Sequence, residues 1–442
     1  MSSRLIYYNS MNKKILSLAI PNIISNITVP LLGLIDIAIV GHLGTEHYIG
    51  AIAVGSMLFS IIYWNFGFLR MGTSGFTAQA YGRRNLNEAT QILLRAISVG
   101  FSIALALILL QSPIQKLVFH LLEAGNEVET HAATYFSICI WGAPAVLGLY
   151  GLKGWYIGMQ NARLPMWIAI TVNIVNILFS LIFVYFLDMK IEGVAYGTVL
   201  AQYAGLLMAA TFWFKYYGRL RHRVNLRESL RWREMKRFFS VNSYIFLRTM
   251  CLVAVTTFFT SSGANRSDLI LAVNTLLMQL FTLFSYIMDG FAFAGEALVG
   301  RYIGAKDMKH LRLSIRYIFR WGWALALFFT VLYAVGGSRF LSLLTDNVQV
   351  LHAAIPYAYW VMAVPLVGFG AFLWDGIFIG ATASKEMSVA MLIATATFFV
   401  LYTLLSASYG NHALWIAFLA YLSLRGLVQA LWFKAIRIRM LS

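Results

Sequence analysis

Long apolar runs, separated by short polar breaks, recur along the whole chain. The first run, from Ile15 to Gly41, holds one charged residue, Asp36. Its 27 residues would form a helix of about 40 Å at ~1.5 Å per residue, enough to cross a hydrocarbon core of ~30 Å. The pattern predicts twelve membrane-spanning helices, near residues 15–41, 48–78, 90–112, 131–158, 164–187, 193–214, 238–260, 268–299, 310–335, 351–380, 387–408 and 412–433.

Composition supports this pattern. The chain is 60% hydrophobic and 12% charged, and its mean hydropathy is +0.73, far above the range of soluble domains. The first run is too long for a secretory signal and has no small-residue cleavage site. We therefore predict an all-α polytopic membrane protein of twelve transmembrane helices.

The distribution of basic residues predicts the orientation. If both termini are cytoplasmic, most of the 34 Lys and Arg lie in inside loops and tails, and the outside loops hold four. This asymmetry follows the positive-inside rule for an inner-membrane protein. The net charge of +17 is thereby explained without nucleic acid. Residues 215–237, with nine basic side chains, are interpreted mainly as a cytoplasmic linker, with contact to anionic lipid as the alternative.

Two loop motifs repeat at one spacing. "AQAYGRRNLNEA" follows the second span and "GRYIGAKDMKHL" follows the eighth, so that Gly304 repeats Gly82 at a sequence offset of 222 (304 − 82). "GWYIGMQNAR" and "GIFIGATASK" align at the same offset, with Gly154 on Gly376. Two independent loops that share an offset indicate an internal duplication.

The duplication predicts two pseudo-symmetric six-helix lobes in the same orientation. We expect an N-terminal lobe at residues 1–214, the basic linker at 215–237, and a C-terminal lobe with a cytoplasmic tail at 238–442. Parallel repeats of this kind are a common plan of transporters. A duplicated bundle without a transport role is the alternative.

Asp36 is the strongest candidate for function in the first lobe. Its repeat partner is Phe258, so the duplicated scaffold does not require an acid there. An ionisable residue inside a membrane is a functional hypothesis by default, and a buried carboxyl group can bind and release a proton near neutral pH. Asn173, Asn176 and Ser180, spaced i, i+3 and i+7, share a helical face that could hydrogen-bond it.

Other residues extend this hypothesis. Pro21 and Pro30 each remove a backbone hydrogen bond near Asp36, so we expect the first helix to bend there. Thr198 and Gln202 offer further polar lining from the sixth helix. The alternative is a static acid held by neighbouring amides, with prolines that serve packing alone.

The second lobe has its own buried charges. Arg248, Asp289 and Asp375 each fall about 15–18 Å from the cytoplasmic edge at ~1.5 Å per residue, and Glu296 lies in the eighth span. A mutually neutralising structural cluster is one interpretation; a second cation site is the other. The cysteines, Cys139 and Cys251, provide neither a disulfide framework nor a metal-binding spacing.

Three motifs carry a family resemblance: "PNIISNITVPLLGLIDIAIVGHLG", "FLRMGTSGFTAQAYG" and "LWDGIFIGATASKEM". They resemble the multidrug and toxic compound extrusion (MATE) transporters, in particular the DinF-like branch. The resemblance implies two six-helix bundles around a central cleft, and export of organic compounds in exchange for H⁺ or Na⁺. It also implies that Asp36 is the protonation site. Many relatives carry "NxxNxxxD" in the fifth helix, where this chain has Ser180 in place of the acid.

The combined expectation is a proton-coupled antiporter that works by alternating access and exports organic, cationic or amphipathic compounds. The alternatives are a Na⁺-coupled antiporter that uses the C-terminal acids, and a flippase for lipid-linked precursors. No nucleophile–base arrangement indicates an enzyme. We expect no cofactor and no metal. The expected partners are small organic substrates and membrane lipids, and the expected state is a monomer.

Overall fold

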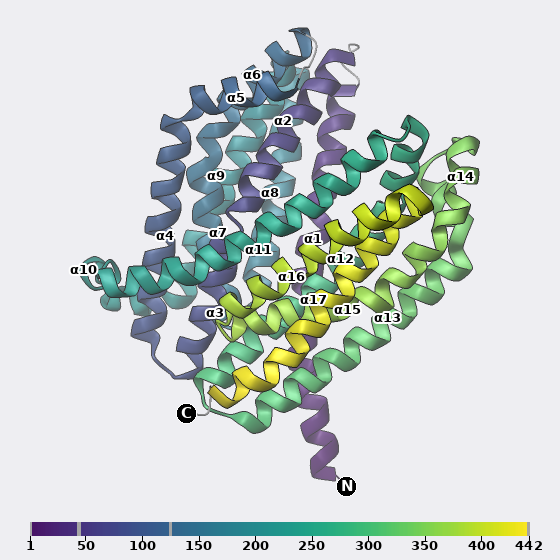
Figure 1. The fold of residues 1–442 in the computed structure, drawn as a ribbon. Helices are drawn as coiled ribbons and strands as arrows, with labels where there is room; N and C mark the ends of the chain where they lie inside the picture. The colour runs from purple at the N-terminus through teal and green to yellow at the C-terminus, as the bar shows by residue number, and fades with distance from the viewer. Residues whose placement is uncertain (1, 42–45, 123–125, 440–442) are drawn as a thin grey trace. The chain divides into compact units, whose positions relative to one another are not determined.

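The computed structural model describes residues 2–41, 46–122 and 126–439, in which the regular elements are all helices (Figure 1). Hydrocarbon offers the backbone no hydrogen-bond partner, and a helix satisfies its own backbone groups. The predicted all-α class is confirmed. The elements are α1 (Ser2–Gly41), α2 (Glu46–Asn65), α3 (Phe68–Gly82), α4 (Leu86–Leu109), α5 (Gln111–Leu122), α6 (Asn126–Cys139), η1 (Ile140–Gly142), α7 (Ala143–Gly158), α8 (Arg163–Leu181), η2 (Ile182–Phe186), α9 (Lys190–Tyr217), η3 (Gly218–Arg223), α10 (Leu226–Ser229), α11 (Trp232–Ala264), α12 (Asp268–Gly304), α13 (Met308–Leu344), α14 (Val348–Ala354), η4 (Ile355–Tyr357), α15 (Ala358–Gly380), α16 (Ser384–Tyr409) and α17 (Asn411–Arg439).

The observed helices agree with the predicted spans. Within the described residues, eleven segments are long and apolar enough to cross a membrane, and each overlaps one prediction from the second span to the twelfth. The first predicted span, 15–41, lies within α1, a single helix of 40 residues that continues through Pro21 and Pro30. The described helices therefore account for all twelve predicted runs.

Four of these spans depart from a continuous α-helix, and one of them, the fifth, ends in the π turn η2 (Ile182–Phe186). The second divides into α2 and α3 at Phe66 and Gly67, the fourth contains the 3₁₀ turn η1, and the tenth contains the 3₁₀ turn η4. Pro144 lies in the first turn of α7 and Pro356 in η4, where a missing N–H is tolerated. These breaks are made of apolar residues, and a reading of polar interruptions therefore does not detect them.

The chain forms two compact units. One contains residues 24–239, and the other combines residues 1–23 with 240–442. In the first unit α7 packs on α3, α4 and α9, and α8 packs on α9 (Figure 1). In the second, α15 packs on α12, α13 and α17, and α16 packs on α17. The sequence assigns residues 1–23 to the first lobe, whereas their contacts lie in the second unit, where Trp321 Nε1 donates to Asn12 Oδ1 (3.1 Å).

The duplication is visible in the backbone. Arg84 and Lys306 have φ values of 59° and 55°, and Gln160 and Thr382 have 66° and 53°. Both pairs are related by the offset of the loop motifs. A left-handed conformation is uncommon for a side chain other than glycine, so its recurrence at one offset shows that both copies end these helices in the same way.

The repeated glycines mark close helix crossings. A methyl group on Gly154 of α7 would overlap the backbone carbonyl of Arg70 in α3, and one on Gly376 of α15 would overlap that of Ala292 in α12. Arg70 and Ala292 are themselves related by the same offset. Small residues let helices approach closely in a membrane. The glycine repeated in the two loop motifs therefore has the same physical cause in both copies, a close crossing of two helices.

We expect Gly376→Ala to lower the melting temperature of the purified protein, because the methyl group would force α15 away from α12. Overpacking of this kind costs typically about 1–3 kcal/mol. Gly370→Ala on the same helix is the control, since no atom lies within 4 Å of its added methyl group. Equal melting temperatures for the two variants would contradict the crossing as the reason for the glycine.

Candidate functional site

Asp36 lies on α1 with 6% of its surface exposed. Its Oδ1 atom is buried and has no hydrogen-bond partner among the described residues. Tyr135 and Cys139 of α6, both buried, interact electrostatically with the carboxyl group, and Ile39 belongs to the apolar core beside it. A charged carboxylate in such surroundings is unfavourable unless it gains a partner or a proton.

Two side chains fix α1 on either side of this acid. Asn173 Nδ2, on α8, donates to the backbone carbonyl of Thr28 (3.1 Å). Tyr185 Oη, on η2, donates to the backbone carbonyl of Ile39 (3.1 Å). The two bonds bracket the segment that contains Pro30 and Asp36. They show which residues of α8 and η2 lie beside which residues of α1.

This register places Ser180 within one helical turn of the acid. Asn173 is level with Thr28 and Tyr185 with Ile39, so Ser180 falls opposite residues 34–35 by residue counting. Ser180 is fully buried, and its Oγ has no hydrogen-bond partner in the described part of the chain.

The structure brings together Asn176 and Thr198, two of the candidate lining residues. Asn176 Nδ2 donates to Thr198 Oγ1 (3.0 Å), which donates to the backbone carbonyl of Val194 (3.0 Å). Asn176 is 1% exposed, and its Oδ1 lacks a hydrogen-bond partner within the described ranges. Three buried polar groups of α1 and α8, on Asp36, Asn176 and Ser180, thus retain unused hydrogen-bonding capacity.

Three further predicted residues, Gln202, Pro21 and Pro30, take no part in these hydrogen bonds. The Oε1 atom of Gln202 packs against Gly142 of η1, one turn along α9 from Thr198. Pro21 is buried and Pro30 is exposed, and α1 remains helical through both. The bending role of the prolines stays a prediction.

Tyr185 was missed by the sequence reading. It lies in the π-helical turn η2, five residues beyond Ser180, where ideal α-helical periodicity puts it on another face. Single π turns inside helices occur frequently at functional sites. An aromatic hydroxyl near the outer end of a polar helix face is the only signal the sequence carries for it.

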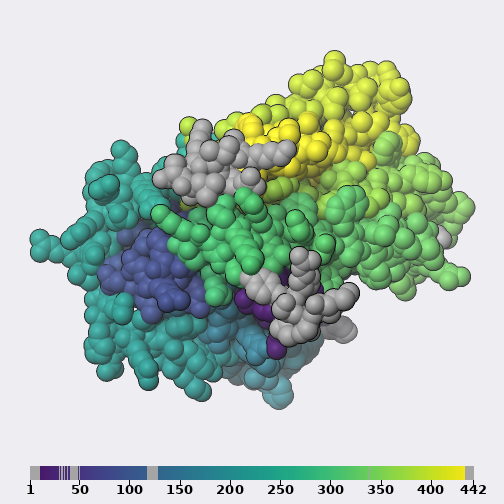
Figure 2. Space-filling model, turned by 90° about the horizontal axis from the view of Figure 1, so that it is seen from below, coloured from purple at the N-terminus to yellow at the C-terminus, as the bar shows by residue number. Residues whose placement is uncertain are grey.

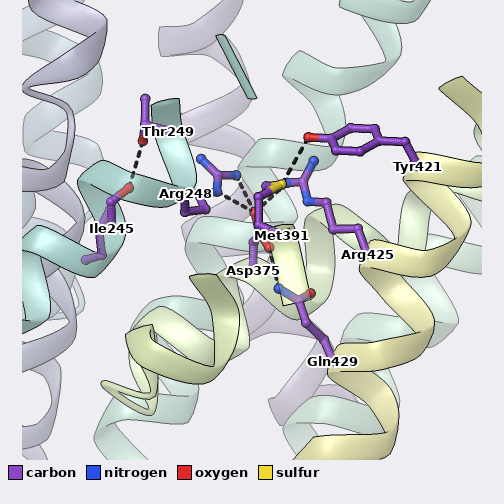
Figure 3. Close-up of polar contacts among 8 residues, drawn as sticks. All are labelled: Ile245, Arg248, Thr249, Asp375, Met391, Tyr421, Arg425 and Gln429. Carbon is purple, nitrogen blue, oxygen red and sulfur yellow. Dashed lines mark hydrogen bonds and ion pairs between the residues drawn. The ribbon is translucent and has the colours of Figure 1, made fainter. Parts of the chain in front are cut away.

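Asp375 is the centre of a second buried polar group (Figure 3). Its Oδ2 atom accepts from Arg248 Nε (2.9 Å) and Nη2 on α11 and from Arg425 Nη2 on α17. Its Oδ1 atom accepts from Gln429 Nε2 (2.7 Å). Asp375 is 4% exposed. Both oxygens are therefore engaged, in contrast to Asp36.

The sequence reading named Arg248 and Asp375 but omitted Arg425 and Gln429. The position of Arg425 within its span could have indicated its place in this group. Arg425 lies about 12 Å from the cytoplasmic end of the predicted span 412–433 at ~1.5 Å per residue. That depth is close to that of the other charged residues. Gln429, one helical turn further, lies on the same face of α17.

The other two acids predicted within the spans of the second lobe, Asp289 and Glu296, do not hydrogen-bond to this group in the described contacts. Asp289 is half-buried on α12 and interacts electrostatically with Arg425. Glu296 is fully buried two turns further along α12, where its backbone carbonyl contacts Gly380 of α15. Within the described chain, no group of three His, Cys, Asp or Glu side chains could hold a metal ion.

Parallel repeats of membrane-spanning helices, with carboxyl groups buried inside the spans, are typical of membrane transporters. The family model described as MatE matches residues 21–182 and again 245–406. The chain therefore belongs to the MatE family of efflux transporters, whose members are not enzymes. The starting points of the two matches, residues 21 and 245, are separated by nearly the same offset as the sequence repeat.

Individual relatives agree with this assignment. DNA damage-inducible protein F of Escherichia coli is 38% identical over 431 residues, which cover 96% of this chain and 93% of that protein. A solved MOP superfamily transporter from Pyrococcus furiosus has a TM-score of 0.86 at 18% identity, over 97% of this chain and 96% of that one. The Vibrio cholerae MATE transporter VcmN, in its bent form, has a TM-score of 0.83 at 19% identity over 98% of both chains.

We expect Asp375→Asn to lower thermal stability strongly, because two arginines would remain buried with no carboxylate between them. Breaking a buried ion pair in this way costs roughly 3–5 kcal/mol. Asp375→Asn combined with Arg248→Met should recover part of the loss, since it also removes one uncompensated charge.

The measurement is the melting temperature of detergent-solubilised protein, with Asp36→Asn as the matched buried control. We expect the control to be less destabilised. An Asp375→Asn protein as stable as wild type but inactive in transport would contradict the structural role and favour a cation site.

Proposed function

We propose that this chain exports organic compounds in exchange for protons, with Asp36 as the group that takes up the proton. The observation that carries the proposal is the buried Asp36 carboxyl group, whose Oδ1 has no hydrogen-bond partner among the described residues. The proposal is finer than the family assignment, which covers efflux transport but neither the coupling ion nor the site.

Unused hydrogen-bonding groups near Asp36 would distinguish its two protonation states. A protonated carboxyl group is a donor, and Asn176 Oδ1 is a buried acceptor with no hydrogen-bond partner in the described part. An ionised carboxylate accepts only. The Ser180 hydroxyl, whose Oγ lies toward Gly197 of α9, would donate to it after a movement of α8 relative to α1. A change in the protonation of Asp36 would therefore change its hydrogen-bond partner on α8, from Asn176 in the protonated state to Ser180 in the ionised state.

Movement of α1 would connect this exchange to transport. Asn173 and Tyr185 hold its backbone at Thr28 and Ile39, and Pro30 removes one backbone hydrogen bond between those points. A proton that neutralises Asp36 would change how this segment packs. Substrate would be released outward in the protonated state and captured from the cytoplasm after the proton leaves.

The proton gradient provides enough free energy for export. One charge that moves through 100 mV supplies about 2.3 kcal/mol, and one pH unit adds about 1.4 kcal/mol. Together they support concentration ratios of several hundred for one-to-one exchange with a neutral substrate.

We expect Asp36→Asn to abolish transport driven by a pH gradient while the protein still folds and inserts, because the amide cannot exchange a proton. Uptake of a fluorescent organic cation into proteoliposomes measures this. Asp346→Asn is the control, because it makes the same chemical change at an exposed position. Wild-type transport by Asp36→Asn would refute the proposal.

The coupling ion can be tested separately. Asp36 is a single acid beside Ser180, a poor site for Na⁺ because hard cations bind several oxygens. Asp375 already accepts hydrogen bonds from two arginines and Gln429. The positive charge of the two arginines would repel a cation.

We therefore expect replacement of all Na⁺ by choline, at a constant pH gradient, to leave the transport rate unchanged. The measurement is the initial rate in proteoliposomes with each salt on both sides. A strict requirement for Na⁺ would favour the alternative that the C-terminal acids bind the coupling ion.

A further inference from the structure

The basic linker, residues 215–237, carries an unusual surface. Its nine Lys and Arg are all exposed, against two acids, Glu228 and Glu234. Much of the linker is helical: α9 continues to Tyr217, η3 and α10 follow, and α11 begins at Trp232. The exposed basic residues are Lys215, Arg219, Arg221, Arg223, Arg227, Arg231, Arg233, Lys236 and Arg237.

Buried polar side chains of α4 hold this linker in place. Arg95 Nε donates to the backbone carbonyl of Ser229 (2.9 Å), and Gln91 Nε2 donates to that of Arg223 (3.2 Å). The hydroxyl of Ser229 bonds Gln91 Oε1. Arg95 and Gln91 are 6% and 4% exposed, and Ser229 is fully buried. The linker is thus attached by a defined set of contacts.

The attachment points lie on the flank of α4. Gln91 and Arg95 are five and nine residues beyond Leu86, the first residue of α4, or about 8 and 14 Å along it. Since α4 is itself a candidate membrane span, α10 lies beside a span (Figure 1). In Figure 2 teal surface, the colour of the part of the chain that includes the linker, borders blue surface, the colour of the part that includes the start of α4. Both attachment points lie near the start of the predicted span 90–112, and a surface at the end of a span can meet the boundary between headgroups and acyl chains.

Apolar side chains on the linker point outward between the arginines. Leu226, Leu230 and Trp232 are 57%, 46% and 79% exposed, and Arg227 and Arg231 alternate with them in the sequence. Tryptophan is enriched at membrane interfaces, and arginine can extend its charged end toward headgroups while its stem covers apolar surface. The combination differs from the purely polar surface expected of a linker in water.

We propose that the basic linker is a binding surface for anionic phospholipids in the leaflet on its own side of the membrane. Its net charge attracts lipid phosphates, and Leu226, Leu230 and Trp232 insert among the upper acyl chains. A nucleic acid or acidic protein would match the charge but not these apolar side chains beside a span. The positive-inside orientation makes this the cytoplasmic leaflet.

The test compares phosphatidylglycerol with phosphatidylcholine, added to the full chain in detergent. Native mass spectrometry counts the bound lipids, and the melting temperature reports stabilisation. We expect wild type to retain phosphatidylglycerol preferentially and to melt at a higher temperature with it. The triple variant Arg223→Gln, Arg227→Gln, Arg231→Gln should lose this preference by at least about tenfold, since each basic residue strengthens attraction to an anionic surface.

Two matched variants make the result specific. Lys306→Gln, Lys309→Gln, Arg312→Gln removes three exposed basic residues after α12 and should keep the preference. Replacement of the three linker arginines by lysine keeps the charge and should also keep it, even if the glutamine variant fails to fold. Loss of the preference in either variant would overturn the proposal.

Competition distinguishes other ligands that carry phosphates. Soluble glycerophosphate and a short oligonucleotide should not displace phosphatidylglycerol at equal concentration, because neither offers acyl chains to the exposed leucines and tryptophan. Displacement by either, or equal retention of both lipids by wild type, would show that the linker is not a lipid surface. The outcome is independent of proton coupling, because none of these residues contacts Asp36 in the proposed mechanism.

Discussion

Every polar group within a bilayer must find its partner in the protein, because hydrocarbon supplies none. The backbone meets this constraint by forming helices, and the helices then meet one another through side chains. Where they cross most closely, Gly154 and Gly376 bring one backbone against the next. Where a charge is buried, as at Asp375, donors from other helices surround it.

Asp36 and Asp375 show the two outcomes of this constraint for the same residue type. Asp375 has both oxygens bonded and an arginine on each of two other helices, so its side chain joins α11, α15 and α17. Asp36 has an oxygen without a hydrogen-bond partner in the described structure, and Asn176 and Ser180 of α8 also have unused hydrogen-bonding capacity. A group in the first situation stabilises a fold, and a group in the second can respond to a proton.

Much of the fold was predictable because membrane helices have a strong sequence signal. Span length, loop charge and the repeated loop motifs predicted the helical class and the duplication, and the left-handed residues Arg84 and Lys306 show the same repeat in the backbone. The interruptions η1 and η4 were not predicted, because apolar residues form them. Part of the candidate site was predictable too: Asn173, Asn176 and Ser180 share a face by helical periodicity alone.

The sequence by itself determined which segments are helices in the membrane, that the chain is duplicated, and that Asp36 is an acid with no counterpart in the second copy. These properties are local, since they follow from hydropathy and spacing along the chain. Only the tertiary structure decided that Tyr185 reaches Ile39, that Arg425 and Gln429 complete the shell of Asp375, and that the basic linker packs on the flank of α4. Those contacts join residues as far as 146 positions apart in the chain, and their geometry depends on how helices pack, which periodicity within one helix does not specify.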